Sequence, residues 1–438
     1  MSPGGAPEDA GRARARYALG LLTVVYVLNF VDRNLLAVLL QPIKEELGIS
    51  DTALGLLTGF AFALFYTAAG IPIARIADRG SRRRVMAVGI AFWSLATAVS
   101  GLARSFGQLA LARIAVGAGE ASATPAAHSL LSDLFPPERR TRAIAIYGMG
   151  ANLGILVGLA LGGFLQERFG WRVAFAVVGL PGLLVALVVG LTLPEPPRGG
   201  SEGRADPGEL PGLPETLRHL ASLPSFRHLC LAAGLYAMAA YGMINWSPTF
   251  LVRVHGWSYA EVGTWLGLTI GLGGAAGTYL GGVACDALAR RDARWLVWSS
   301  ALAGTALIPL FAVFALAPDA RVALWAFVPV NMLNVVFAAP TYALAQGLAQ
   351  LRMRALASAI VLFVLNLVGL GLGPTLVGWL NDRLEPRFGQ EAIRYSLLLV
   401  VCANLWAALH SLLAARTLRA DLARSAAPPP PPAPRDRR

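Results

Sequence analysis

Apolar stretches of about 20 residues, each long enough to cross a bilayer, recur along nearly the whole chain. Such a stretch forms a helix in the membrane, because every backbone polar group there must find a partner within the segment. Only 14% of the 438 residues are charged, whereas a soluble domain needs far more charge to cover its surface. The sequence therefore predicts an all-α membrane protein that crosses the bilayer many times.

About twelve spans are predicted, in two groups of six separated by one long polar interruption rich in proline, glycine and charge. The predicted spans are 17–41, 53–76, 84–103, 107–131, 140–166, 171–192, 226–252, 258–284, 294–316, 321–348, 354–380 and 391–415. The predicted organisation is an N-terminal segment 1–16, a six-helix bundle 17–193, a linker 194–225, a second six-helix bundle 226–416, and a tail 417–438. The proline run Pro428–Pro432 predicts that the tail is disordered.

The net charge of +12 comes from arginines that lie mainly in short connections between the apolar spans. Such arginines orient helices by the positive-inside rule, which puts both termini and the linker in the cytoplasm. No basic face with interleaved aromatic residues is seen, so nucleic acid is not an expected partner. Lys44 is the single lysine, and this arginine- and alanine-rich composition suggests a bacterial inner membrane as the location.

One charged pattern occurs at the cytoplasmic ends of both the second and the eighth predicted span. At both places a carboxylate at the helix end is followed by arginines. Because the pattern occurs at equivalent places in the two halves, it indicates an internal repeat. We expect a charge-paired latch that holds the cytoplasmic ends together in one conformation and releases them in the other. The latch residues are Asp78, Arg79, Arg82, Arg83, Asp286 and Arg290.

Two motifs resemble the major facilitator superfamily, and the resemblance covers residues 17–416. The stretch Asp78-Arg79-x-x-Arg82-Arg83 matches its loop signature, although Ala74 and Ser81 stand where glycines are usual. The run 154–158 (GILVG), followed by Gly162-Gly163, resembles its glycine motif in the fifth helix, where small residues let backbones approach closely. The resemblance implies the major facilitator fold, transport by alternating access, a monomer and no cofactor.

Three further stretches resemble the spinster-like branch of that superfamily: 29–33 (NFVDR), 113–121 (RIAVGAGEA) and 132–140 (SDLFPPERR). Members of that branch move lysolipids and sphingoid phosphates, some of them with protons. The resemblance implies an anionic lysophospholipid or sphingosine-phosphate-like substrate. Because organic-anion:cation symporters share the Asp-Arg and Gly-Glu-Ala elements, small organic anions or drugs are the alternative substrate class.

Charged residues inside predicted spans are costly and persist mostly where they pair or line a watery path. At about 1.5 Å of rise per residue, Asp32 lies some 22 Å from the cytoplasmic start of its span, and Arg113 about 9 Å from the outer end of another. In a core about 30 Å thick these depths are similar, which predicts an ion pair between Asp32 and Arg113. This pair either serves transport or only stabilises one conformation.

Glu120 lies two helical turns from Arg113, nearer the midplane, with Gly117 and Gly119 leaving room beside it. We expect no arginine at its level, so that desolvation disfavours its charged form. Glu120 is therefore the predicted main proton acceptor and Asp32 a second one. Arg33 or Arg113 is the predicted anchor for an anionic head group.

Other polar and aromatic residues of the spans are predicted to contact substrate, although amides there also bond neighbouring helices. They are Tyr26, Asn29, Phe30 and Thr124 in the first half, and Tyr241, Asn245, Trp246, Asn331, Asn334 and Asn366 in the second. No phosphate-binding loop, catalytic triad or metal-ligand spacing is found, so an enzyme is not expected. A non-transporting membrane sensor is the alternative of another class, but charges retained within the spans favour transport.

Overall fold

The computed structural model describes residues 5–196, 213–350 and 353–426, and every regular element in that part of the chain is helical. The first half consists of α1 (Gly5–Leu47), α2 (Asp51–Thr58), α3 (Phe60–Arg79), α4 (Arg82–Ser100), α5 (Phe106–Glu120), α6 (Ala123–Leu134) and α7 (Pro137–Thr192). The second consists of α8 (Leu213–Ser222), α9 (Pro224–His255), α10 (Tyr259–Ala289), α11 (Trp295–Leu316), α12 (Ala320–Asn334), α13 (Ala338–Gly347), α14 (Arg354–Val364), the π-helix η2 (Leu365–Leu372), α15 (Gly373–Phe388), the 3₁₀-helix η3 (Gly389–Glu391), α16 (Ala392–Val401) and α17 (Ala403–Ala426).

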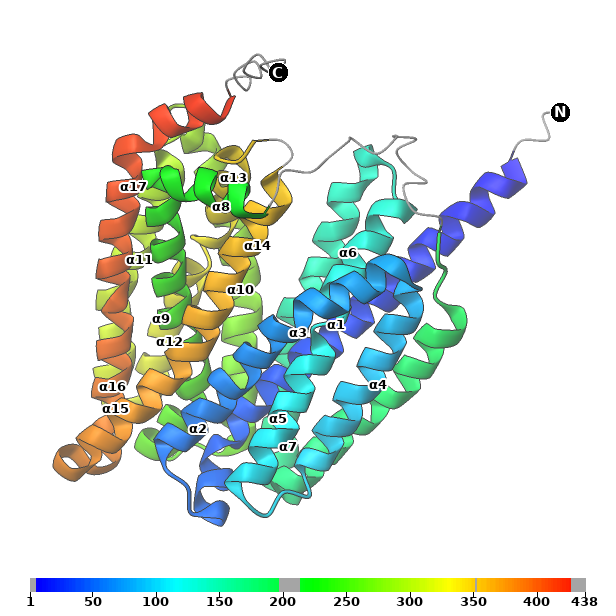
Figure 1. Ribbon diagram of the computed structural model, residues 1–438. Helices are drawn as coiled ribbons and strands as arrows, with labels where there is room; N and C mark the ends of the chain where they lie inside the picture. The colour runs from blue at the N-terminus through cyan, green and yellow to red at the C-terminus, as the bar shows by residue number, and fades with distance from the viewer. Residues whose placement is uncertain (1–4, 197–212, 351–352, 427–438) are drawn as a thin grey trace, which may run out of the picture.

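The helices form two bundles that stand side by side, as Figure 1 shows. Each bundle has six membrane crossings in the described chain, because α2 with α3, α5 with α6, α12 with α13, α14 to α15, and α16 with α17 each make one crossing, and α7 makes two. We call the end of the molecule with both chain termini and α8 the linker end, and the opposite end the closed end. The predicted twelve-span architecture is confirmed.

Eight stretches of the described chain are long and apolar enough to span a membrane by length and composition. Two of them, Glu138–Thr192 and Leu356–Ser425, hold 55 and 70 residues, which is far more than one crossing needs. Within α7 the chain reverses at Gly170, whose positive φ of 81° is readily adopted only by glycine. Spans five and six are therefore joined by a turn rather than by a loop.

Prolines interrupt three crossings that hydropathy predicts as continuous helices. Pro125 and Pro340 lack an N–H and crowd the carbonyls of Ala121 and Val336, four residues earlier, where α5 gives way to α6 and α12 to α13. Pro374 acts in the same way on the π-helix η2, which precedes it. The first two breaks occupy the fourth crossing of each half, so they repeat with the fold.

The predicted segments at the chain ends need correction. α1 begins at Gly5 and α17 continues to Ala426, so residues 5–16 and 417–426 are helical, and the first part of the predicted disordered tail is not disordered. Alanine and arginine dominate both stretches, and these residues favour helix. Parts of the predicted segments, 1–4, linker residues 197–212 and tail residues 427–438 with Pro428–Pro432, lie outside the described residues.

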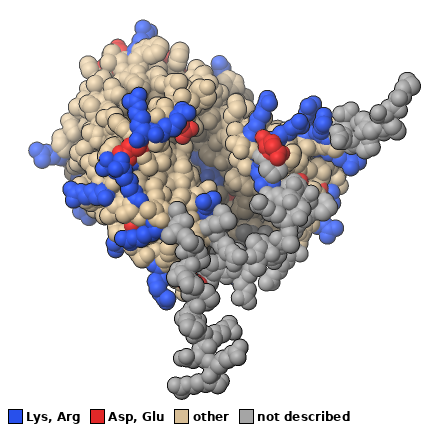
Figure 2. All heavy atoms as spheres, turned by 90° about the horizontal axis from the view of Figure 1, so that it is seen from above, with Lys and Arg blue, Asp and Glu red and all other residues tan. Residues whose placement is uncertain are grey.

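The two halves are held together at the closed end. Every hydrogen bond recorded between the halves in the described chain involves residues 41–55 or Glu167 on one side, and Arg253, Ala260 or residues 375–382 on the other. Seen from the linker end, a hollow lies between the two lobes (Figure 2). The conformation described is thus open toward the linker end.

Candidate transport site

The ion pair predicted between Asp32 of α1 and Arg113 of α5 is present. Arg113 Nη1 donates to Asp32 Oδ1 at 3.2 Å, and the Thr97 hydroxyl of α4 donates to the other carboxylate oxygen. Asp32 is 3% exposed and Arg113 is 2% exposed. Three helices therefore join at one fully buried, charge-balanced contact.

Glu120 is also paired, which contradicts the expectation that no arginine lies at its level. Arg33 Nε donates to Glu120 Oε2 at 2.6 Å, and the Glu120 side chain is fully buried. The prediction was wrong because it placed residues by backbone depth, whereas the long arginine side chain extends well beyond its own helical turn. The cluster thus contains two carboxylates and two arginines in two separate pairs.

The surroundings of Arg33 distinguish it from Arg113. Its guanidinium carbon lies 4.8 Å from the ring centre of Phe62, 4.7 Å from that of Tyr66 and 5.4 Å from that of Phe30, and its side chain is 18% exposed. A guanidinium over aromatic faces gains cation–π stabilisation. Arg33 is thus the more accessible cation of the cluster, held beside an apolar, aromatic wall.

Glu120 is the last residue of α5, at the break imposed by Pro125. The turn is closed by Ser122, whose hydroxyl donates to the Gly119 carbonyl at 2.8 Å. A Cβ on Gly89 of α4 would lie 1.8 Å from Ser122 Oγ, so α4 packs directly against this turn. Glu120 Oε1 and both side-chain polar atoms of Asn29 are buried without a hydrogen-bond partner among the described residues. The carboxylate thus keeps free acceptor capacity.

The other predicted contacts of the first half lie beside this cluster on α1 and α6. Tyr26 stacks on Tyr147 with ring centres 4.3 Å apart, and Phe30 meets Tyr26 edge-on at 5.0 Å. Tyr26, Phe30 and Thr124 are partly exposed. The aromatic wall near Arg33 therefore extends along α1.

The predicted residues of the second half differ in whether they lie beside residues of the first half. Tyr241 is partly buried and packs against an apolar cluster that contains Phe62 of the first half and Leu370 of the second. The amide groups of Asn245 and Asn331 donate to the carbonyls of Tyr241 and Phe327 in their own helices, at 2.9 Å each. Asn334 and Asn366, 8% and 7% exposed, lie at the end of α12 and within the π-helix η2. Of these five predicted residues, Tyr241 is the one that packs against the apolar cluster containing Phe62.

Trp246 lies away from the cluster, near the closed end. It is completely buried, and its indole N–H donates to the Pro374 carbonyl of α15 at 2.9 Å. The polar atom of this side chain is therefore already used inside the second half. The structure thus does not bring Trp246 together with the charged cluster, and its predicted contact with substrate stays a prediction.

The predicted latch residues make no recorded contact between the halves in the described chain. Arg82 is buried and donates to Asp133 and to Ser129 of α6, the latter at 2.9 Å, and to the Pro196 carbonyl at 2.7 Å. Within the described residues, Arg83 donates to the Leu193 carbonyl at 3.5 Å. Asp286 and Arg290 are exposed, and the side chains of Asp78 and Arg79 lie outside the described residues.

Sequence reasoning missed several residues that complete the site. Thr97, Phe62 and Tyr66 were absent from the prediction because a threonine or an aromatic residue in an apolar span is the ordinary content of a membrane helix. Spacing along one helix does not reveal which residue of another helix faces it. Finding them from the sequence would have required knowing which predicted spans pack against each other.

The sequence of this chain matches the profile of the Major Facilitator Superfamily over residues 22–374. The chain belongs to the major facilitator superfamily. A protein of Mycolicibacterium smegmatis named as an MFS-type efflux pump is 37% identical over 398 residues, which cover 90% of each chain. The human protein spinster homolog 1 is 30% identical over 416 residues, covering 88% of this chain and 78% of the human one.

A solved structure supports the same assignment. The crystal structure of a bacterial homolog of the human lysosomal transporter Spinster, in an inward-facing and unoccupied conformation, matches this transporter with a TM-score of 0.84. The two sequences are 32% identical, and the match covers 93% of this chain and 98% of the other. This transporter is therefore a multi-pass membrane protein of the spinster-like branch.

Proposed function

We propose that this transporter carries an anionic amphiphile, a lysophospholipid or sphingosine-phosphate-like lipid, by proton-coupled alternating access. The observation that supports the proposal most is the pairing of each buried carboxylate with one arginine, Arg33 with Glu120 and Arg113 with Asp32. Buried charges are rare in membrane helices and mark substrate or proton pathways.

The pairing links proton and substrate through charge balance. A proton on Glu120 removes the negative charge that Arg33 faces, so the positive charge of Arg33 needs another anion. An anionic head group arriving from the hollow supplies that charge, and its departure favours loss of the proton. Glu120 is thus the main proton acceptor, Arg33 the head-group anchor, and the more enclosed Asp32–Arg113 pair a second proton site.

An apolar body is accommodated by the aromatic residues beside Arg33. Phe30, Phe62 and Tyr66 surround the guanidinium on the first half, and Tyr241 reaches the same cluster from the second. A charged anchor next to an apolar wall suits a ligand with an ionic head and a hydrocarbon tail. Small organic anions fit the anchor but leave this wall without a partner.

We place the linker end on the cytoplasmic side of a bacterial inner membrane, since arginines gather there. The conformation described here is then inward-open, as in the similar bacterial structure. The latch residues Asp78, Arg79, Arg82, Arg83, Asp286 and Arg290 would meet across the halves when this end closes. A monomer is sufficient, since the cluster lies within one chain.

The test is transport by purified protein in liposomes, with and without a pH gradient, using a fluorescent lysophospholipid and a radiolabelled small organic acid. We expect gradient-driven movement of the lysolipid, and loss of that stimulation in Glu120→Gln, which keeps the shape of the side chain but cannot exchange a proton. Glu138→Gln, an exposed change at the linker end, is the control and should behave as the unmodified protein. Unchanged proton dependence in Glu120→Gln would refute the coupling, and movement of the small acid alone would refute the lipid substrate.

A further inference from the structure

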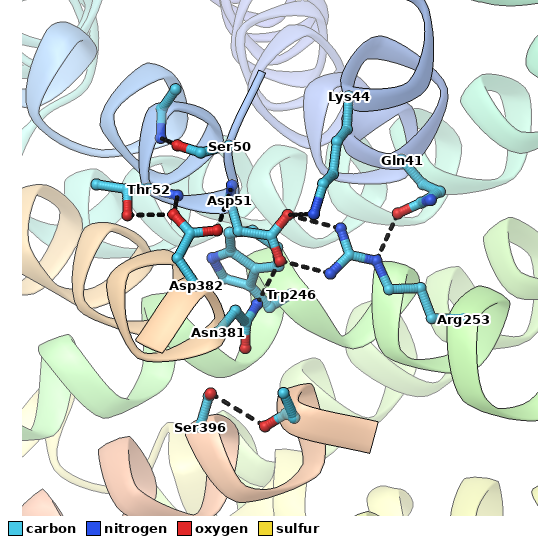
Figure 3. A network of polar contacts seen from close by, with 12 residues as sticks. Gln41, Lys44, Ser50, Asp51, Thr52, Trp246, Arg253, Asn381, Asp382 and Ser396 are labelled. Atoms are coloured by element: carbon cyan, nitrogen blue, oxygen red, sulfur yellow. Dashed lines mark hydrogen bonds and ion pairs between the residues drawn. The ribbon is translucent and has the colours of Figure 1, made fainter. Parts of the chain in front are cut away.

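The closed end carries a polar network that joins the two halves around Asp51, the first residue of α2 (Figure 3). Arg253 of α9 donates from its two terminal nitrogens to Asp51 Oδ2 and Oδ1 at 2.5 and 2.7 Å. Asn381 of α15 donates to Asp51 Oδ2 at 3.0 Å, and Lys44 Nζ lies 2.8 Å from Oδ1. A bidentate arginine–carboxylate pair of this kind is among the strong polar contacts of proteins. Asp51 is only 1% exposed, so water competes poorly for it.

A second carboxylate of the other half caps the same helix. Asp382 of α15 accepts the backbone N–H groups of Asp51 at 3.0 Å and Thr52 at 2.8 Å, and also the Thr52 hydroxyl at 2.5 Å. The first N–H groups of a helix have no partner within it, and its N-terminus favours negative charge. Ser50 caps α2 from its own half through the Ala53 N–H, so the second half supplies the remaining acceptors. We call Gln41, Lys44, Asp51, Thr52, Arg253, Asn381 and Asp382 the closed-end network.

Backbone packing ties α2 to α15 along its whole length. A Cβ on Gly55 would lie 2.5 Å from the Pro374 carbonyl oxygen, and one on Gly378 would lie 2.1 Å from that of Asp51. The Thr375 hydroxyl lies 3.1 Å from the Gly55 carbonyl oxygen, as a further contact between the halves. α2 is therefore attached to the second half through both side chains and backbone.

Each of these two helices joins its own half through a segment that is not α-helical, and the two segments meet. α2 joins α3 through Gly59, with φ −100° and ψ −98°, and α15 follows the π-helix η2. A Cβ on Gly59 would lie 2.4 Å from the Gly371 carbonyl oxygen of η2. Glycine and π-helical segments are common places for a helix to bend.

We infer that α2 and α15 form a hinged gate for the closed end, held shut by the closed-end network and bending at Gly59 and η2. This inference rests on the alternating access of the proposed function, and it adds which contacts must break. The polar contacts of the seam suit this task, because each group that loses its protein partner on opening gains water. Apolar residues of both halves also share one core cluster, and opening would expose part of that hydrophobic surface. Trp246 and the Pro374 carbonyl keep α9 and α15 together while α2 separates from them.

The test measures the width of the closed end by double electron–electron resonance. Spin labels are placed at Arg104→Cys and Arg321→Cys, which are exposed at that end in the first and the second half, after replacement of the three native cysteines by alanine. Asp51→Asn and Asp382→Asn each remove charge-assisted hydrogen bonds between the halves. We expect the ratio of wide to narrow distances to rise about tenfold or more in each. Thr52→Val removes one hydroxyl contact and should give a smaller shift in the same direction.

The matched control is Glu46→Gln. Glu46 accepts from Arg172 at 2.7 Å and from the Trp171 indole at 2.5 Å, so it forms an ion pair at the same end but inside the first half. Loss of this ion pair should leave the distances between the two spin labels unchanged. The gate inference is overturned if well-folded Asp51→Asn, Asp382→Asn and Thr52→Val all match Glu46→Gln. No substrate is needed for these distances, so a widened closed end without lysolipid transport would support the gate and count against the proposed substrate alone.

Discussion

Asp32, Arg33, Arg113 and Glu120 form a cluster with no net formal charge, and each carboxylate has its own arginine. Removing one member of a buried pair leaves an uncompensated charge and costs about 3–5 kcal/mol, whereas the intact pair contributes little net stability. The two pairs differ in access, since Arg113 is enclosed by helices and Arg33 is partly exposed against aromatic rings. That difference is the reason we propose Arg33, rather than Arg113, as the anchor for the head group.

The aromatic ring of Tyr66 gives a test of how Arg33 is held. Tyr66→Leu removes one face of the cation–π contact, which is worth about 0.5–2 kcal/mol, so we expect the half-saturating lysolipid concentration to rise about 2- to 30-fold. Tyr66→Phe keeps the ring and should stay close to the unmodified protein. Initial transport rates over a range of lysolipid concentrations measure both. Equal behaviour of the two variants would show that the ring does not support the anchor.

At this scale the sequence predicted one of the two ion pairs of the cluster and missed the other. The Asp32–Arg113 pair followed from depth counting, because the two residues are predicted at similar depths in the membrane, and the structure contains this pair. The Arg33–Glu120 pair did not, because the arginine side chain extends beyond its helical turn. Asp51 and Arg253 lie 202 residues apart near helix ends, where charges are ordinarily topology signals, so nothing in the sequence joined them.

At the scale of elements, α7 and α10 make close backbone contact between the two halves. A Cβ on Gly163 would lie 2.1 Å from the Tyr259 carbonyl oxygen, and one on Gly263 would lie 2.2 Å from that of Leu159. Small residues in membrane helices permit such approach, and the resulting packing replaces the hydrophobic driving force that lipid removes. The glycine motif recognised in the sequence therefore has its partner glycine on the facing helix.

Gly263→Ala should separate these helices. The added methyl group cannot fit beside the Leu159 carbonyl, and overpacking of this kind costs about 1–3 kcal/mol. We expect a lower thermal unfolding temperature and a larger wide-distance fraction at the closed end. Gly282→Ala on the same helix has no atom within 4 Å of its new Cβ and should unfold no earlier than the unmodified protein. An unfolding temperature in Gly263→Ala equal to that of the control would contradict this account.

The crossings themselves followed from hydropathy, but their interruptions did not. Hydropathy averages over about 20 residues, so the breaks near Ser122 and Val335 are invisible to it although Pro125 and Pro340 mark both places. For the same reason, hydropathy did not predict how the chain turns at Gly170, between two predicted spans. Local proline and glycine chemistry therefore carries the information that the apolar pattern lacks.

At the scale of the whole molecule, the recorded polar contacts between the halves in the described chain lie at the closed end. At the other end, none is recorded among the described residues for Arg82, Arg83, Asp286 or Arg290. Arg82 is bonded inside the first half, and Asp286 is exposed. A two-state carrier needs contacts that favour each state, since a population shifts only by the difference in free energy between the states. The latch residues are thus candidates for contacts that exist only when the linker end is closed.

Asp286→Asn tests that role. Because Asp286 is exposed here, the variant should change the free energy of unfolding by less than about 0.5 kcal/mol, the range of ordinary surface changes. Transport should nevertheless slow, since the state with a closed linker end loses a contact. Thermal unfolding and initial transport rates provide the two measurements. Glu215→Gln, an exposed change on α8, is the control, and transport equal to it would remove Asp286 from the latch.

The connections between crossings at the closed end are short. They contain three residues after α1, five after α4, three after α9 and three after α11, while Gly170 alone turns α7 and the 3₁₀-helix η3 joins α15 to α16. A protease needs an extended stretch of substrate, and connections of three to five residues offer little of one. Bulky tags and affinity reagents for this protein therefore belong at the linker end. If α2 and α15 form the gate inferred above, a ligand arriving from the opposite side must pass between them.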